Sequence, residues 1–214
     1  MSQLKLTADG GGGTVSLKGP STTTGNAAIE LTVPGTESAT VDTLGRAGNI
    51  IQVVNMVKTD TASLSMTTSF QDISGFTISI TPTAANSKII LAGSIVLESH
   101  QQYCFGKFVR NINGGSYSSP TGWLGNAASS RTQSQFGNNY RSPGSPDALT
   151  PSPMAIYAVD TDHNTTNTIN YKLQYKAHNS SGPYTIFFNR AHNDSDQAAS
   201  PRACSHLTLM EVAA

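Results

Sequence analysis

The chain has 214 residues, of which 37% are hydrophobic, so it is long enough to bury the core of one sizeable domain. Only 12% of the residues are charged, and the formal net charge is zero. The lysines and arginines form no basic patch for nucleic acid, and no run of about 18 apolar residues or apolar signal segment is present, so we expect no nucleic-acid partner, no membrane insertion and no secretion signal.

The polarity of the chain comes from Ser, Thr and Asn rather than from charged residues. These side chains hydrogen-bond to nearby backbone and are poor residues for a helix interior. No stretch repeats apolar residues at the i, i+3, i+4, i+7 spacing of an amphipathic helix. We therefore predict an all-β protein with many turns.

Residues 1–48 contain three short segments in which apolar and polar residues alternate, QLKLTA at 3–8, TVSLKG at 14–19 and IELTVPG at 29–35. The apolar residues of the first two segments are Leu4, Leu6, Val15 and Leu17. Each segment has too few apolar side chains to be stable alone in water. We therefore expect residues 1–48 to lie against other copies of the chain or against another protein.

Four consecutive glycines, Gly10, Gly11, Gly12 and Gly13, separate the first two segments. A phosphate-binding loop would run into a helix and carry a Lys-Ser or Lys-Thr pair. Here the glycines run into TVSLK, which alternates like a strand. We interpret DGGGG at 9–13 as the loop of a β-hairpin, where glycine adopts positive φ angles without steric cost.

From Gly48 onward, eight longer segments have the alternation or the apolar content of strands, with turn residues between them. They are NIIQVVNMVKT (49–59), FTISITP (76–82), KIILAGSIVLES (88–99), YCFGKFVRNI (103–112), MAIYAVD (154–160), INYKLQYKA (169–177), YTIFFNR (184–190) and HLTLMEV (206–212). This spacing predicts a β-sandwich of the jelly-roll type over residues 49–214. Cys104 and Cys204 fall in strand-like sequence, which is typical of two reduced thiols, with a disulfide between adjacent strands as the alternative.

The polar interval from Asn113 to Pro153 is too long for an ordinary connection. It mixes aromatic side chains with Ser, Asn and Gly, a composition typical of recognition surfaces. For the single tryptophan, the alternative is that its ring fills the core or a subunit interface. The predicted receptor-binding residues are Tyr117, Trp123, Arg131, Phe136, Tyr140 and Arg141.

Catalytic and metal-binding patterns are weak in this sequence. No G-x-S-x-G motif is present, and the 13 acidic residues do not form a recognisable pair of glycosidase carboxylates. The segment with His192, Asp194 and Asp196 lacks the glycine and the distant Glu of a calcium loop. The favoured role of these residues is to form Asx turns in a loop. The alternative is a cation held between subunits by His192 or His206. We expect no enzymatic activity, no cofactor and no resident metal.

Two parts of the sequence resemble bacteriophage virion proteins. SQLKLTADGGGGTVSLKGP followed by IELTVPG is similar to the N-terminal segments of tail fibres, especially those of phages that infect marine bacteria and cyanobacteria. GNIIQVV, TSFQDISGFTISITPTAANSKIIL, YKLQY, NRAHNDSD and HLTLMEVAA resemble a domain found in the same setting. The resemblance implies a virion protein, assembled in the host cytoplasm, that is trimeric and docks by its N-terminus.

Taken together, these features predict a phage tail fibre with two parts. Residues 1–48 would attach to a tail, collar or baseplate protein and take part in an intertwined homotrimer. Residues 49–214 would present a β-sandwich to polysaccharide on the host surface. The alternative is a capsid decoration, cement or head-fibre protein with a purely structural role.

Overall fold

The computed structural model describes residues 3–7, 14–18, 46–99, 103–138, 150–178 and 184–214. The chain separates into two compact units, Met1–Val41 and Asp42–Ala214. The predicted boundary after residue 48 lies a few residues beyond this division. The separate role of each part stays a prediction.

In the first unit, β1 (Gln3–Thr7) and β2 (Thr14–Lys18) form an antiparallel pair. The register sets Leu4 opposite Leu17 and Leu6 opposite Val15. The predicted hairpin strands are therefore confirmed. The glycines of the connection and the segment at 29–35 lie outside the described residues.

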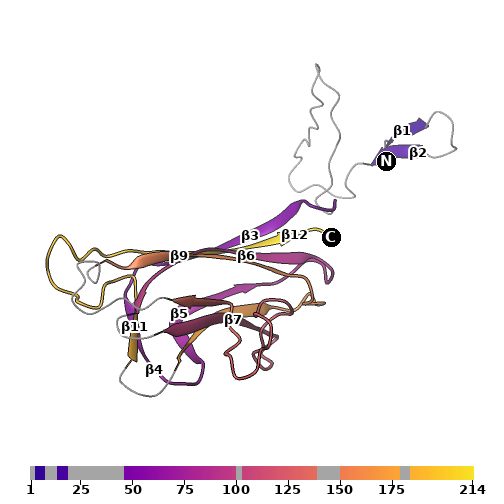
Figure 1. The fold of residues 1–214 in the computed structure, drawn as a ribbon. Helices are drawn as coiled ribbons and strands as arrows, with labels where there is room; N and C mark the ends of the chain where they lie inside the picture. The colour runs from indigo at the N-terminus through magenta and orange to yellow at the C-terminus, as the bar shows by residue number, and fades with distance from the viewer. Residues whose placement is uncertain (1–2, 8–13, 19–45, 100–102, 139–149, 179–183) are drawn as a thin grey trace. The chain divides into compact units, whose positions relative to one another are not determined.

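The second unit contains two antiparallel sheets with one hydrophobic core between them, so the predicted all-β sandwich is confirmed. The smaller sheet has the order β5 (Gln71–Ile80), β10 (Ile169–Ala177), β7 (Cys104–Ile112), β8 (Phe136–Asn138). The larger sheet has the order β3 (Ile50–Lys58), β12 (Ser205–Val212), β6 (Lys88–Ser99), β11 (Tyr184–Phe188), β4 (Ala62–Met66), with β9 (Ser152–Asp160) also paired to β6. Figure 1 shows β3, β12, β6 and β9 in one layer and β5 and β7 in the other.

Alternation along each strand decides which residues enter the core. In β10, Ile169, Tyr171, Leu173 and Tyr175 are all fully buried, while the residues between them are partly exposed. Such a strand packs one face against the opposite sheet and leaves the other toward solvent. Tyr175 contacts Phe188 of the larger sheet, with ring centroids 5.9 Å apart.

All eight strands predicted for residues 49–214 are present, and two further strands, β4 and β8, were not predicted. β4 has only two large apolar residues, Leu64 and Met66, and β8 is three residues long. Both are defined by their neighbours, because β4 pairs with β11 and β8 pairs with Cys104–Gly106 of β7. Cys104 and Cys204 are not joined in a disulfide, so the disulfide alternative does not apply.

No helix in the described part of the chain is long and apolar enough to cross a membrane. The intertwined homotrimer stays a prediction.

Candidate recognition surface

The loop between β11 and β12 contains the weak metal candidates. Asn189 anchors its base: its side-chain amide donates to the carbonyls of Lys58 at 2.8 Å and Asp60 at 2.9 Å, and it accepts from Ser205 at 2.6 Å. This residue is fully buried with φ of 60°, a conformation that asparagine tolerates better than most residues. The loop is therefore built on a fixed base.

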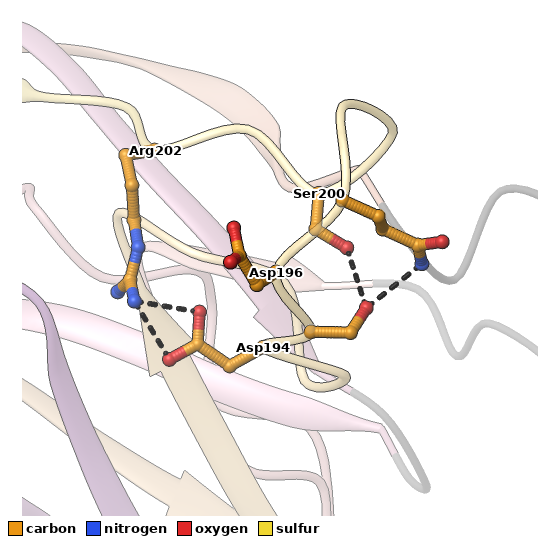
Figure 2. A pocket seen from close by; sticks show the side chains of 6 residues that line it. Asp194, Asp196, Ser200 and Arg202 are labelled. Carbon is orange, nitrogen blue, oxygen red and sulfur yellow. Dashed lines mark hydrogen bonds and ion pairs between the residues drawn. The ribbon is translucent and has the colours of Figure 1, made fainter.

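A shallow pocket of about 310 Å³ lies within this loop (Figure 2). The Asp194 carboxylate there forms an ion pair with Arg202 at 2.9 Å and a longer one with Arg190 at 3.6 Å. The guanidinium groups occupy the oxygens that a cation would need. Asp194 therefore holds the loop together, which corrects its assignment as a metal candidate.

The other two metal candidates, His192 and Asp196, do not form a metal site with Asp194. The His192 backbone N–H donates to the Glu98 carboxylate at 2.7 Å, and its Nδ1 lies 3.6 Å from the other oxygen of Glu98. Asp196 lines the exposed pocket. Among the residues that the structure describes, no three His, Cys, Asp or Glu side chains come together as a metal site would require.

The long loop after β7 folds back along that strand. Its turn uses Asn113 and Gly114, both with positive φ, and residues 110 and 118 then bridge through backbone hydrogen bonds of 2.8 and 2.9 Å. Since β8 pairs only with the first residues of β7, this bridge adds a second backbone contact farther along the same edge. The loop is thus an ordered part of the sandwich up to β8.

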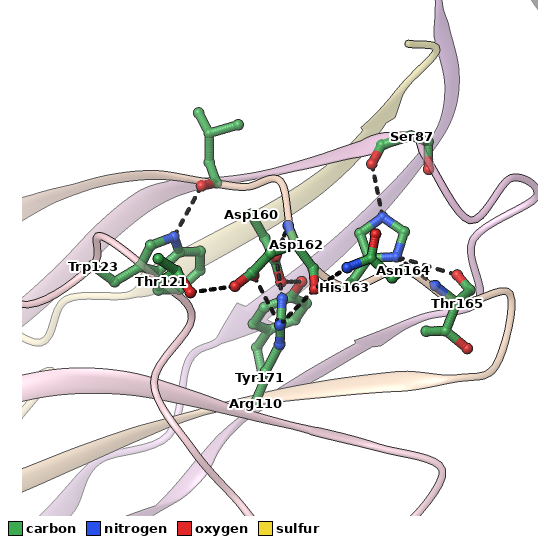
Figure 3. Close-up of polar contacts among 11 residues, drawn as sticks. Ser87, Arg110, Thr121, Trp123, Asp160, Asp162, His163, Asn164, Thr165 and Tyr171 are labelled. Atoms are coloured by element: carbon green, nitrogen blue, oxygen red, sulfur yellow. Dashed lines mark hydrogen bonds and ion pairs between the residues drawn. The ribbon is translucent and has the colours of Figure 1, made fainter.

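Trp123 closes the side of the sandwich between the two sheets. Its indole is 7% exposed and stacks on Tyr171, with ring centroids 5.8 Å apart and planes 16° apart. The indole N–H donates to the Val159 carbonyl of β9 at 3.0 Å (Figure 3). Trp123 is therefore a core residue, so the alternative of a core position is confirmed and the prediction of an exposed receptor contact is wrong.

A buried polar network next to Trp123 holds the loop ends to the sheets (Figure 3). Arg110 pairs with the fully buried carboxylate of Asp160 and with Asp162 at 2.8 Å, and Tyr171 donates to Asp160 at 2.6 Å. Thr121 donates to Asp162 from the loop that carries Trp123. The Arg110 guanidinium thus connects β7 with the last residue of β9 and with the segment after it. A buried charge requires such pairing.

The pKa values in this network follow from burial and pairing. The hydrogen bond from Thr121 outweighs partial burial and, with Arg110, lowers the pKa of Asp162. Burial and the Asp160 charge raise the pKa of Tyr171 far above its ordinary value. Burial opposes the charge of Arg110, but its bonds to Asp160 and Asp162 outweigh that effect and raise its pKa. All three groups are therefore fixed in one protonation state near neutral pH, which suits a structural role.

His163, also in this region, is a structural residue. It is 3% exposed, and its two ring nitrogens lie 2.8 Å from the Ser87 carbonyl and 3.1 Å from the Thr165 carbonyl. The ring joins the β5–β6 loop to the β9–β10 loop. We assign no ligand-binding role to it.

The outward face of the smaller sheet has a different character, because cations there lie over aromatic rings. Lys172 Nζ sits 3.5 Å from the centre of the Tyr117 ring and forms an ion pair with Asp72 at 2.6 Å. The Gln174 amide donates to the other oxygen of Asp72 at 2.7 Å. Such an arrangement holds a half-exposed ring and several polar groups in fixed positions.

A second cation–aromatic group lies further along the same face. Lys107 Nζ is 4.3 Å from the centre of the Phe70 ring, and Lys176 Nζ is 5.8 Å from it. Burial lowers the pKa of Lys107. Lys176 also lies 3.4 Å from the Thr132 hydroxyl of the long loop. We call the whole set the cation–aromatic surface: Phe70, Asp72, Lys107, Tyr117, Lys172, Gln174 and Lys176.

The chemistry of the cation–aromatic surface suits a polyhydroxylated anionic ligand. Three lysines against one aspartate give it a net positive charge, and the rings offer flat apolar faces beside hydrogen-bond donors. Of its residues, only Tyr117 was predicted from the sequence. The alternation in INYKLQYKA could have indicated Lys172, Gln174 and Lys176, because polar residues at every second position of a half-buried strand share the outward face.

The remaining predicted receptor residues are placed as follows. Arg131 is exposed in the long loop. Phe136 is partly buried against Phe108 and Tyr175, with ring centroids 6.3 and 5.7 Å away, so it is an interior residue rather than an exposed contact. Tyr140, Arg141 and the attachment glycines Gly10, Gly11, Gly12 and Gly13 lie outside the described residues. Leu4, Leu6, Val15 and Leu17 lie in β1 and β2.

The fold defines the class of the second unit as an antiparallel β-sandwich with an ordered side loop. No family model and no curated protein matches the chain. Similar solved structures include the VP2 subviral particle of infectious bursal disease virus, with TM-score 0.40, 12% identity, and coverage of 93% of this chain and 51% of that one. The Gx strain of the same virus gives TM-score 0.38, 14% identity, and coverage of 94% and 43%.

Particles of T=1 symmetry derived from infectious bursal disease virus give TM-score 0.37, 15% identity, and coverage of 94% and 43%. The chain therefore spans about half the length of these structures or less. Likeness at this level concerns the β-sandwich arrangement, and no function is carried over from it.

Proposed function

We propose that the chain is a structural protein of a virion, of the tail-fibre type, whose sandwich binds acidic polysaccharide on the host surface. The cation–aromatic surface supports this proposal, because it combines net positive charge, fixed aromatic rings and an amide on one outward face. The resemblance of residues 1–48 to tail-fibre attachment segments supports the virion role. The mechanism is binding and not catalysis.

Weak single contacts suffice in this mechanism. A lysine paired with an exposed acidic group contributes about 1 kcal/mol or less, so one copy binds one sugar unit weakly. Several copies on one particle, facing a polymer with repeated acidic units, bind far more tightly through effective concentration. The structural requirement is that each copy presents the same rigid surface.

The binding test uses the full-length protein and alginate, a polymer of uronic acids, with neutral dextran as the comparison polymer. Lys172→Ala removes the cation between Tyr117 and Asp72 and should weaken alginate binding about fivefold, as expected for the loss of about 1 kcal/mol. Lys88→Ala is the matched control, because it removes one exposed lysine from the larger sheet and should leave binding unchanged.

The measurement is the dissociation constant by calorimetry or by retention on immobilised alginate, at low and physiological salt. Tyr117→Ala should reduce binding at both salt concentrations, since the ring contact is less screened than the charge contact. Equal losses in Lys172→Ala and Lys88→Ala would show a response to net charge alone. That result, or equal binding of dextran, would contradict a recognition surface.

The position on the virion separates the tail-fibre proposal from the decoration-protein alternative. Antibodies against the sandwich should label the tail of the particles in electron microscopy, and label spread over the capsid would favour decoration. Replacing Gly11 and Gly12 with Val should reduce incorporation into particles while the sandwich stays folded, because valine disfavours the positive φ angles of a tight hairpin loop. Unchanged incorporation would show that this hairpin loop is not needed for attachment to the virion.

A further inference from the structure

The outward face of the larger sheet differs from the cation–aromatic surface on the other side of the sandwich. The strand registers place three rows of four side chains on it, each row crossing β3, β12, β6 and β9. We call these rows the uncharged face: Val53–Met210–Ile90–Val159, Asn55–Thr208–Ala92–Tyr157 and Val57–His206–Ser94–Ala155. No Asp, Glu, Lys or Arg is among the twelve residues.

Large apolar side chains on the uncharged face are open to solvent. Val53 is 52% exposed, Val57 61% and Tyr157 71%, whereas Leu91, Leu207 and Leu209 on the core side of the same strands are fully buried. Contiguous exposed apolar patches beyond a few hundred Å² mark interaction sites in soluble proteins. The face is therefore a candidate site for a covering partner.

We infer that this partner is a second copy of the same chain, docked through the uncharged face. A face without formal charge meets its own copy without repulsion between like charges. It offers nothing to phosphate backbones, lipid headgroups or charged peptides, which need ionic partners. Closed symmetric assemblies of identical chains are the commonest oligomers, and they bury such faces against themselves.

The size of the face is compatible with this occupant. The three rows cover five residues along each of four strands, and at about 3.4 Å per residue and about 4.8 Å between strands they outline about 19 by 17 Å, or roughly 320 Å². The accessible area of side chains standing on that outline is larger than the outline itself. A stable interface of standard size buries about 800 Å² on each partner. The uncharged face is thus the centre of a contact between two copies, and its rim supplies the rest of the buried area.

The rim also fits an interface. Beyond the first row, Lys88 pairs in register with Val212, so the nearest charged side chain on β6 lies at the margin of the face. Charged groups at the rim and few charged groups at the centre are typical of protein–protein interfaces. This inference uses the face opposite to the cation–aromatic surface, so it holds or fails independently of host binding.

The test introduces a negative charge into the uncharged face of the full-length protein. Tyr157→Glu and Val53→Glu each place a carboxylate at an exposed position, where substitutions seldom affect folding. Thr77→Glu is the matched control, since Thr77 is an exposed strand residue on the outward face of the other sheet. Sedimentation velocity over roughly 0.1–100 µM protein measures self-association, and circular dichroism checks that each variant is folded.

The wild type and Thr77→Glu should form oligomers, while Tyr157→Glu and Val53→Glu should raise the dissociation constant about 100-fold or more, as expected for unpaired charge in an interface. If a Glu variant is unfolded, Tyr157→Ser removes the apolar contact without charge and should also weaken association. Wild-type protein that stays monomeric at 100 µM overturns the proposal. Oligomers unaffected by Tyr157→Glu also overturn it, because copies then meet elsewhere.

Discussion

Replacing Trp123 tests whether this residue is a core side chain or a receptor contact. Trp123→Ala removes an indole that is 7% exposed and stacked on Tyr171. Large-to-small changes of a buried tryptophan cost about 3–5 kcal/mol, because apolar burial is lost and a cavity remains. For a protein of this size, that corresponds to a fall in melting temperature of roughly 10 °C.

Trp123→Phe separates the packing from the hydrogen bond. Phenylalanine keeps an aromatic ring against Tyr171 but cannot donate to the Val159 carbonyl, which now receives the indole N–H at 3.0 Å. The expected loss is about 1–2 kcal/mol, for the missing hydrogen bond and the smaller ring. The order of stability should therefore be wild type, then Trp123→Phe, then Trp123→Ala.

The assay is urea unfolding followed by far-ultraviolet circular dichroism, since both variants lack the single tryptophan of the chain. Wild-type fluorescence adds a second readout: a buried indole should emit at short wavelength and resist quenching by acrylamide. The reasoning is refuted if Trp123→Ala unfolds within 1 kcal/mol of wild type while alginate binding is lost. That result would return Trp123 to an exposed recognition role.

Three further predictions concern the sandwich. Arg110→Met should lower the free energy of unfolding by about 3–5 kcal/mol in denaturant titrations, because it leaves the Asp160 carboxylate buried without its cation. Adding Asp160→Asn to this variant should recover part of the lost stability. A double variant that is no more stable than Arg110→Met would argue against the ion pair. The pKa of Asp162 is lowered in the folded protein, so its charged form adds stability above the ordinary pKa of aspartate, about 4, and this stability is lost as pH falls through the lower folded pKa. Wild type should therefore lose more stability than Asp162→Asn between about pH 5 and 2. Parallel pH profiles of the two proteins would contradict this. Gly106→Ala should cost about 1–3 kcal/mol and increase hydrogen exchange in β8, since its methyl group would overlap Phe136 by lying 2.0 Å from its ring; unchanged exchange would show that the ring can move aside.

Much of the fold could be predicted from the sequence, because strand alternation is local. The eight strands that were predicted for residues 49–214 follow from alternation, as in INYKLQYKA, or from a high apolar content. β8 could not be found this way, since a three-residue strand has no period and exists through its pairing with Cys104–Gly106. The β1–β2 pairing was predictable because a glycine-rich turn between two alternating segments indicates a hairpin.

The candidate surfaces were far less predictable. The aromatic content of the long loop indicated recognition, yet the structure turns Trp123 and Phe136 inward and leaves Tyr117 under Lys172. The ion pair between Asp72 and Lys172 joins residues one hundred positions apart. No local pattern reports such a contact, because it depends on β5 and β10 being neighbours in one sheet.

By itself, the sequence determined the class of the protein: low charge, many Ser, Thr and Asn residues and period-two alternation leave an all-β chain with one face of each strand in the core. Tertiary structure alone decided what the other faces do. Alternation predicts that Lys172 and Val53 both point away from the core. It does not predict that Lys172 joins the cation–aromatic surface and Val53 the uncharged face. The reason is physical, since strand order sets which outward side chains become neighbours, and strand order is a property of long-range pairing.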